Sequence, residues 1–227
     1  MINRLRWLDW RRRWRRQRVR SGPVGDFLAT ALPPPGRTLA DCRYVALDLE
    51  TTGGNAGRDR IVSVGWVLVD RHGVDLATAR HRLVANEQAL TPGSVVIHGI
   101  TDDELSGAPP LVDVLTEVLA VLRGQVMLAH HARTEQLFLA AACRRCFGHT
   151  PVIPAIDTLQ LAARVLPRGA RETPGIWRLS SLRRAFHLPP HPAHDALGDA
   201  IATGELFLAL ARALPAGPRS ALAPLLY

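Results

Sequence analysis

The sequence predicts an α/β domain in which helices flank a mixed five-stranded sheet. Three β-rich runs separated by turn signals occupy residues 43–84, an order typical of an antiparallel meander. Helical periodicity then alternates with two short apolar runs, which indicates two further, parallel strands. Hydrophobic residues make up 47% of the 227 residues, which is enough to form a core.

Each element follows from a local pattern. RYVALDLE is a short run of β-favouring residues that ends in two acids, and the turn RHG separates DRIVSVGWVLVD from TARHRLV. The expected strands are 43–50, 59–70, 78–84, 126–130 and a strand end at the start of 154–166. The expected helices, from apolar residues at helical spacing, are 110–122, 133–147, the remainder of 154–166, 179–188 and 194–214.

The N-terminal segment differs sharply in charge from the rest of the chain. Residues 1–20 hold nine arginines and one aspartate, which equals the net charge of +8 for the whole chain. Trp7, Trp10 and Trp14 lie three and four residues apart, so a helix would place them on one face, although Arg11 and Arg18 fall near that face. Arginine with tryptophan suits phosphate backbones and base stacking. It suits an anionic membrane surface or a partner groove equally well, and a disordered basic tail is the alternative.

These patterns divide the chain into four parts. We predict a basic arm over 1–20, a linker over 21–41 that contains three successive prolines, a globular domain over 42–214 and a short tail over 215–227.

Composition excludes several classes of protein. No apolar run reaches the length of about 18 residues that a transmembrane helix needs. The charged N-terminus lacks the apolar segment of a secretory signal. Three cysteines are too few for a disulfide framework, which favours a reducing cytoplasm.

Two acids stand at the end of the first strand, in DLETTG. Asp48 and Glu50 are two residues apart, so a strand directs both side chains to the same face. Paired carboxylates on a buried face are costly unless a cation lies between them, and oxygen ligands indicate Mg²⁺ or Mn²⁺. A strand end that reaches solvent is the alternative.

A second group of polar residues stands near the C-terminus, in HPAHDALGDA. His194 and Asp199 are five residues apart. If His194 lies in the loop before the helix, its side chain can reach the site that Asp199 faces. A role for His194 beside a helix cap is the alternative.

The two groups and a middle segment, His130-x-Ala132-x-x-Glu135, occur in an order that resembles the DEDDh family of 3′–5′ exonucleases. This family contains the epsilon proofreading subunit of bacterial DNA polymerase III and ribonuclease T. The resemblance covers residues 42–212, and further matching segments are IVSVG, IHGIT, AIDT and SSLRRAFHLPPHPAHDALGDA.

The resemblance implies a ribonuclease-H-like fold and hydrolysis from a 3′ end that releases nucleoside 5′-monophosphates. It implies two divalent metal ions, Mg²⁺ or Mn²⁺, held by Asp48, Glu50 and Asp199 with support from Glu135. His194 would be the general base, a task that suits an imidazole near neutral pH. The residues expected near the substrate are Thr51, Thr52, Gly53, His98 and His131.

The middle segment departs from the family pattern H-N-A-x-F-D. His131, Thr134 and Glu135 replace the asparagine, the phenylalanine and the aspartate. Glutamate keeps the charge and adds one methylene, which predicts an active D-E-E-D-h variant. The alternative is that Glu135 only stabilises the start of its helix, where a negative charge is favourable.

Several hypotheses about function stay open. Only about 14 residues follow the last expected helix, too few for the polymerase-binding segment of the epsilon subunit. We therefore favour a stand-alone exonuclease, or one recruited through its basic arm, that acts on single-stranded or frayed DNA. The alternatives are an RNA-directed 3′ exoribonuclease and a weak or inactive relative that binds nucleic acid.

Overall fold

The computed structural model describes residues 4–19, 21–86, 93, 96 and 98–226. Five strands form one sheet in the order β3-β2-β1-β4-β5. The strands are β1 (Tyr44–Thr51), β2 (Ile61–Asp70), β3 (Gly73–Leu83), β4 (Val126–Ala129) and β5 (Ala155–Asp157). The first three pair antiparallel, and β4 and β5 join parallel on the other side of β1. The predicted mixed sheet is therefore confirmed.

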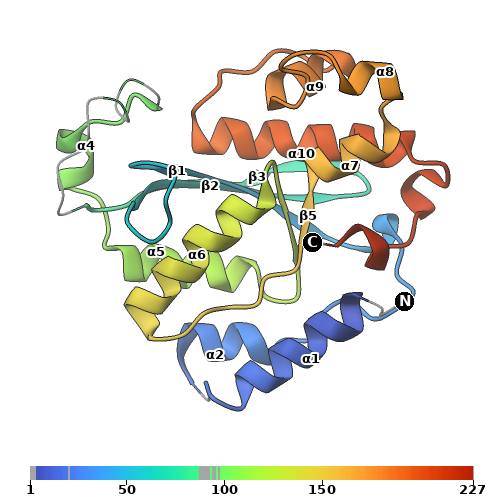
Figure 1. Ribbon diagram of the computed structural model, residues 1–227. Coiled ribbons are helices and arrows are strands. Elements are labelled where there is room, and N and C mark those ends of the chain that lie inside the picture. The colour runs from blue at the N-terminus through green and yellow to red at the C-terminus, as the bar shows by residue number, and fades with distance from the viewer. Residues whose placement is uncertain (1–3, 20, 87–92, 94–95, 97, 227) are drawn as a thin grey trace.

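Helices cover both faces of this sheet (Figure 1). On one face α10 (Ala196–Ala213) packs along β1, β2 and β3, and α7 (Thr158–Val165) and α9 (Leu179–Ala185) lie beside it. On the other face lie α5 (Leu111–Val121) and α6 (Ala132–Phe147). The shorter helices are α4 (Asp102–Ser106), α8 (Arg168–Arg171) and the 3₁₀ turns Leu39–Asp41, Gly217–Arg219 and Ala223–Leu225. Among the described residues, no helix has the length and apolar content needed to cross a membrane.

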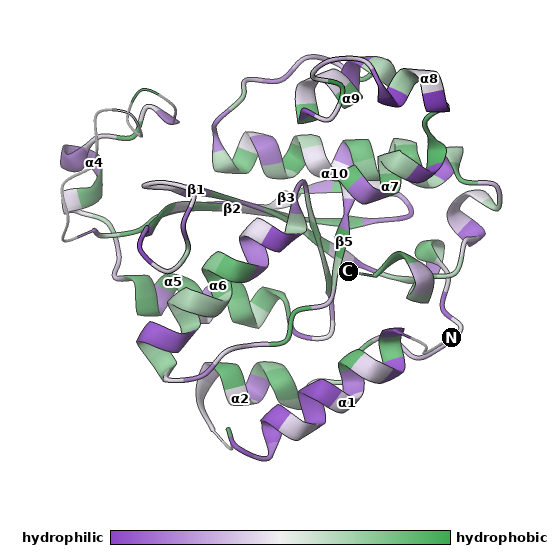
Figure 2. Ribbon diagram, viewed as in Figure 1, coloured by the Kyte–Doolittle hydropathy of each residue, from purple (hydrophilic) through white to green (hydrophobic). Residues whose placement is uncertain are grey.

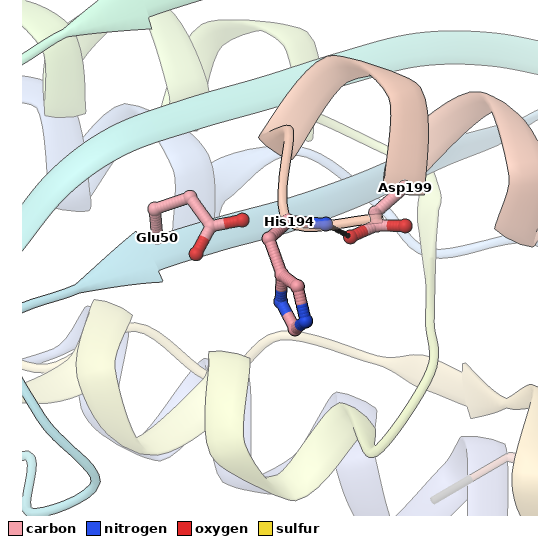
Figure 3. A group of neighbouring side chains, drawn as sticks. All are labelled: Glu50, His194 and Asp199. Carbon is pink, nitrogen blue, oxygen red and sulfur yellow. Dashed lines mark hydrogen bonds between the residues drawn. The ribbon is translucent and has the colours of Figure 1, made fainter. Parts of the chain in front are cut away.

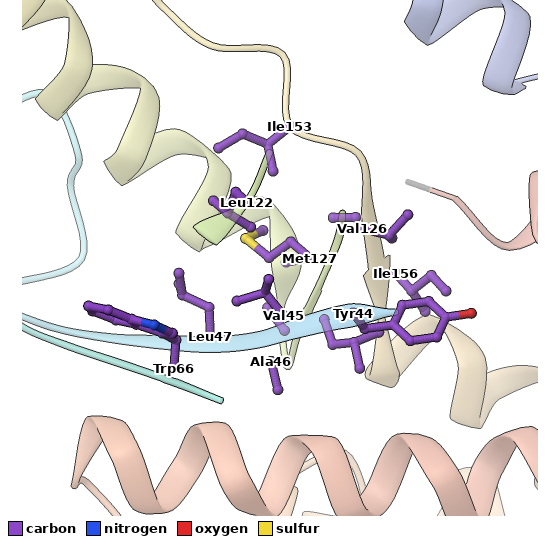
Figure 4. Close-up of a cluster of buried hydrophobic side chains, with 14 of the residues drawn as sticks. Tyr44, Val45, Ala46, Leu47, Trp66, Leu122, Val126, Met127, Ile153 and Ile156 are labelled. Atoms are coloured by element: carbon purple, nitrogen blue, oxygen red, sulfur yellow. The ribbon is translucent and has the colours of Figure 1, made fainter. Parts of the chain in front are cut away.

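The side chains of β1 alternate between the two faces of the sheet. Val45 and Leu47 point into the core on the α5–α6 face, whereas Ala46 points toward α10 (Figure 4). By the same alternation, Asp48 and Glu50 lie on the α10 face. Both predicted acids are therefore on the face that α10 covers.

Gly65 sets how closely α10 approaches this face. It pairs with Asp48 across the β1–β2 ladder. A Cβ atom at Gly65 would lie 2.2 Å from both the carbonyl carbon of Ala196 and the amide nitrogen of Leu197. Only a glycine allows this contact, which places the first turn of α10 beside the acids of β1.

The N-terminal residues form helices, whereas the sequence suggested a linker and allowed a disordered tail. Residues 4–16 form α1 (Arg4–Arg16), and residues of the expected linker form α2 (Gly22–Ala29). Val24, Phe27 and Leu28 recur at helical spacing and are buried, so α2 packs on α5 and α6. The assignment of 21–41 as a linker is therefore corrected: α1 and α2 form a further layer beyond α5 and α6 (Figure 1).

Candidate active site

Three side chains meet where β1 ends under the start of α10. Glu50, His194 and Asp199 each place a potential ligand atom within 4.8 Å of the others. Glu50 comes from β1, Asp199 from the first turn of α10 and His194 from the preceding loop (Figure 3). The structure thus joins two motifs that lie about 150 residues apart in the sequence.

The loop before α10 is shaped by its own backbone contacts. Asp195 is the N-cap of the helix, and its side chain accepts a hydrogen bond of 2.8 Å from the amide of Gly198. His194 has a left-handed backbone with φ of 65°, and its amide donates to Asp199 Oδ2 at 2.9 Å. The imidazole of His194 is left exposed and points away from α10 (Figure 3).

Asp48 and Glu135 add two further acids to this cluster. Asp48 lines the cavity beside His194 and Asp199, and Glu135 is buried in the first turn of α6. One carboxylate oxygen of Glu135, Oε2, is buried without a hydrogen-bond partner among the described residues. Buried polar atoms normally have partners, so this oxygen is a candidate contact for a cation or for a water.

The pKa values of three of these acids are raised above their ordinary values. Burial, and then the charges of Glu135, Asp199 and Glu50, raises the pKa of Asp48 well above its ordinary value. Burial, followed by the charges of Asp199 and Asp195, raises the pKa of Glu50 to about 7. Burial, and then the charge of Asp157, raises the pKa of Glu135 to about 8.

This donor set fits divalent metal ions. Carboxylate oxygens are the ligands that Mg²⁺ and Mn²⁺ prefer, and a cation would lower each of these raised pKa values. Asp48, Glu50, Asp199 and Glu135 can supply the oxygen ligands, and the unpartnered Oε2 of Glu135 is available to a water in the shell of such an ion.

His191, in the loop before α10, also belongs to the site. Its Nε2 lies 2.8 Å from Asp199 Oδ1, so the Asp199 carboxylate contacts both His191 and the backbone of His194. This contact depends on the path of the 189–194 loop, which local sequence patterns do not specify.

His130 and Asp157 hold the surrounding segments in place. His130 Nε2 lies 2.9 Å from the carbonyl of Trp177, which can only accept, so this nitrogen donates and Nδ1 accepts from Thr158 Oγ1 at 2.8 Å. Burial lowers the pKa of His130, which favours this neutral form. The carboxylate of Asp157 accepts from the amides of His131 and Leu159, and so ties the starts of α6 and α7 together.

His131 takes a left-handed conformation at the N-cap of α6, with φ of 69°. Asparagine and histidine are among the residues that adopt this conformation most readily. The geometry therefore gives a physical reason why a histidine can stand where the resemblance expects asparagine.

The other predicted substrate residues lie at the edges of the site. Thr51 Oγ1 donates to the Gly53 carbonyl at 2.8 Å, and Thr52 Oγ1 accepts from the amide of Arg60 at 3.0 Å, so both hydroxyl groups brace the loop after β1. Burial, and then His194, lowers the pKa of His98. The Nε2 of His98 is buried without a hydrogen-bond partner among the described residues.

An open cavity of about 650 Å³ adjoins the cluster. Of the predicted residues it contacts Asp48, His131, His194 and Asp199. The segment 175–180 forms another wall, to which Trp177 and Arg178 contribute. Sequence reasoning missed these two residues, although an adjacent tryptophan and arginine in a loop after a glycine could have indicated a binding segment.

Comparisons with known proteins agree with this geometry. A family model described as Exonuclease, RNase_T, matches residues 45–207. The DNA polymerase III subunit epsilon of Treponema pallidum is 33% identical over 164 residues, which cover 72% of this chain and 74% of that protein. The PolC-type DNA polymerase III of Thermotoga maritima is 31% identical over 171 residues, which cover 75% of this chain but only 12% of that protein.

Two solved structures share the fold. Exonuclease X in complex with 5′ overhanging duplex DNA superposes with a TM-score of 0.53 at 25% identity, over 74% of this chain and 90% of that chain. E. coli exonuclease I in complex with a dT13 oligonucleotide superposes with a TM-score of 0.62 at 19% identity, over 75% of this chain and 41% of that chain.

Proposed function

The chain belongs to the exonuclease family, and we propose that it releases nucleoside 5′-monophosphates from the 3′ end of single-stranded or frayed nucleic acid, with DNA favoured. The observation that carries the proposal is the cluster of Asp48, Glu50, Glu135 and Asp199 beside the exposed imidazole of His194, at the edge of an open cavity. Acids that repel each other in this way suit a polyanionic substrate only when cations are bound.

Asp48, Glu50 and Asp199 would hold two divalent ions, Mg²⁺ or Mn²⁺, with Glu135 contributing through water. When bound, such a pair stabilises both the attacking and the leaving oxygen of a phosphodiester. Asp195 and Gly65 act indirectly, because they fix the first turn of α10 and so the position of the Asp199 carboxylate.

His194 would be the general base. The hydrogen bond from its amide to Asp199 fixes its backbone, and the imidazole is free to accept the proton of the attacking water. Asp199 also contacts His191, which would orient this carboxylate rather than accept the proton.

The cavity would hold the terminal nucleotide. His131, Trp177 and Arg178 line it and would contact the base, sugar or phosphate. The loop of Thr51, Thr52 and Gly53, which follows Glu50, and the half-buried His98 would approach the 3′ end.

A product assay tests this function. Matched DNA and RNA oligonucleotides with a 5′ label are incubated with Mg²⁺ or Mn²⁺. We expect mononucleotides and a ladder that shortens from the 3′ end, faster on DNA and abolished by EDTA. Faster release from RNA would make the chain an exoribonuclease. No release in either metal would leave a nucleic-acid-binding relative.

The His194→Ala variant tests the proposed base. We expect the rate to fall by about 10²–10⁴, the range of general-base catalysis, while Mn²⁺ binding measured by calorimetry persists. Full activity in this variant would remove His194 from the mechanism.

A further inference from the structure

Helix α1 is a fixed part of the surface. Leu5 and Leu8 are buried, and Arg12 is 1% exposed. The guanidinium of Arg12 donates to the carbonyl oxygens of Val152 at 2.8 Å, Phe27 at 2.5 Å and Thr30 at 3.0 Å, and it stacks on the Phe27 ring. These contacts orient the rest of the helix relative to α2 and α6.

The outer side of α1 carries tryptophan and arginine together. Trp7 and Trp14 are 44% and 46% exposed, and the guanidinium groups of Arg11 and Arg18 lie over their rings at 4.6 and 3.5 Å from the centroids. Asp9 is the sole acid of α1, and it pairs with Arg13. Figure 2 shows α1 as a mainly hydrophilic helix beside the apolar α2.

A groove of about 360 Å³ joins this side of α1 to α6. Trp7 and Arg11 form one wall, Arg133 and Gln136 form the other, and residues 151–153 also line it. Arg133 lies in the first turn of α6, two residues after His131, which lines the active-site cavity. The groove and the cavity are therefore lined by residues only two positions apart at the start of α6.

Positive charge continues along the helix from this groove. Arg15 is near Arg11, Arg18 and Arg144, and partial burial followed by repulsion from these three groups lowers the pKa of Arg15. A cluster of cations attracts a polyanion that supplies several negative charges in a row.

We propose that Trp7, Arg11 and the adjoining arginines of α1, together with Arg133, bind the part of a single strand that lies 5′ of the nucleotide being removed. Bases stack on exposed aromatic rings and arginines contact the phosphates, as in other sites for single strands. The inference rests on the proposed function, because the groove has this role only if a 3′ end occupies the cavity.

A membrane surface suits α1 less well. An amphipathic helix binds a bilayer through its apolar residues. Here the leucines Leu5 and Leu8 are already buried against the domain and do not face outward. A groove between α1 and α6 accommodates an extended chain and not a flat bilayer.

The test measures strand binding by the full chain in Mn²⁺, with every variant for this measurement made in a His194→Ala background, where the metal ions stay bound and hydrolysis is slowed about 10²–10⁴-fold. Fluorescence anisotropy compares a labelled thymidine oligonucleotide of about 20 nucleotides, longer than a typical single-strand site, with a tetranucleotide. In the Trp7→Ala, Arg11→Ala double variant we expect affinity for the long strand to fall about tenfold or more, and affinity for the tetranucleotide to stay unchanged. The slope of log affinity against log salt should decrease by about 0.7 for each phosphate that the variant no longer binds.

The matched control is the Trp10→Ala, Arg13→Ala double variant. Trp10 and Arg13 lie on the same helix but border a different pocket, next to residues 31–35, so long-strand affinity should stay as in the unmodified chain. Equal losses in the two double variants, or no loss in either, would overturn the proposal. Loss of binding to phosphatidylglycerol vesicles without loss of oligonucleotide binding would assign α1 to membranes instead.

Hydrolysis of the p-nitrophenyl ester of thymidine 5′-monophosphate in Mn²⁺ separates this proposal from the proposed function. The ester reaches only the active site, so both double variants should cleave it at the rate of the unmodified chain. If the unmodified chain releases no nucleotide from the ester or from strands, the proposed function fails. Normal ester cleavage with unchanged strand binding in the Trp7→Ala, Arg11→Ala variant would defeat the α1 proposal alone.

Discussion

Of the regions that bury charged side chains, two do so in opposite ways. At the α1–α2 contact, the buried guanidinium of Arg12 meets three carbonyl oxygens and an aromatic ring. Burial lowers the pKa of Arg12 only to about 10, so it remains charged at neutral pH. At the end of β1, Asp48, Glu50 and Glu135 meet mainly other acids, and the pKa of each is raised.

The difference distinguishes a structural charge from a functional one. A buried charge with hydrogen-bond partners joins segments, as Arg12 joins α1 to α2 and to residue 152. Buried acids without cationic partners store electrostatic repulsion that a bound cation can relieve. Desolvation of a charge therefore indicates a structural contact where the charge has hydrogen-bond partners, as at Arg12. It indicates a metal site where several acids are desolvated together.

The largest stability effect is expected at Arg12. The Arg12→Ala variant removes the hydrogen bonds to three carbonyl oxygens and the stacking on Phe27, and we expect a loss on the order of 3–5 kcal/mol in the free energy of unfolding. Urea unfolding measures this loss, and limited proteolysis at residues 4–19 would detect release of α1 alone. The control is Arg13→Ala, an exposed ion pair where little change is expected. Equal stability of the two variants would contradict the anchoring role.

The acids near the end of β1 should make the protein less stable as the pH rises. An ordinary salt-bridged acid has the opposite effect. The folded pKa values of Glu50 and Glu135, about 7 and about 8, exceed the ordinary value of 4.5, so the unfolded chain releases these protons at lower pH. The free energy of unfolding in EDTA should therefore fall as pH rises from 4.5 to about 8, and then level off. We expect Tm to fall by about 5 °C or more across this window, and Mn²⁺ to restore it at pH 8. A Tm that rises with pH in EDTA would contradict the account.

A smaller effect is expected from Glu135→Gln. The variant removes one of the groups that titrate in this window, so Tm in EDTA should depend less steeply on pH than in the unmodified chain. Nuclease activity at saturating Mn²⁺ should fall sharply, because the second metal loses support. An unchanged rate with an unchanged pH dependence would assign Glu135 only to the start of α6.

Patterns in the sequence were sufficient for the sheet, whereas the approach of the three motifs was implied by the resemblance to the exonuclease family. The strand ending in Asp48-x-Glu50 and the helix that starts near Asp199 are set by local apolar spacing. Helix α2 was missed because Gly22, Pro23 and Gly25 weaken its helical signal, and it is stabilised by tertiary burial of Val24 and Phe27.

Contacts across distant segments were beyond the reach of sequence patterns. The contact between His191 and Asp199 depends on a loop path, and the wall formed by Trp177 and Arg178 depends on the hydrogen bond that His130 donates to the Trp177 carbonyl. Likewise, the sequence of α1 did not show which of its arginines and tryptophans face solvent. The burial of Arg12 determines which side of the helix faces outward.

The central claim is that the acids clustered around the end of β1 form a two-metal centre, and calorimetric titration with Mn²⁺ tests it most directly. The titration is run at pH 7.5, between the raised pKa values, in two buffers with different ionisation enthalpies. We predict two ions bound per chain and a heat that depends on the buffer, because binding displaces protons from the carboxyl groups. Failure to bind Mn²⁺, or binding whose heat is the same in both buffers, would contradict the account.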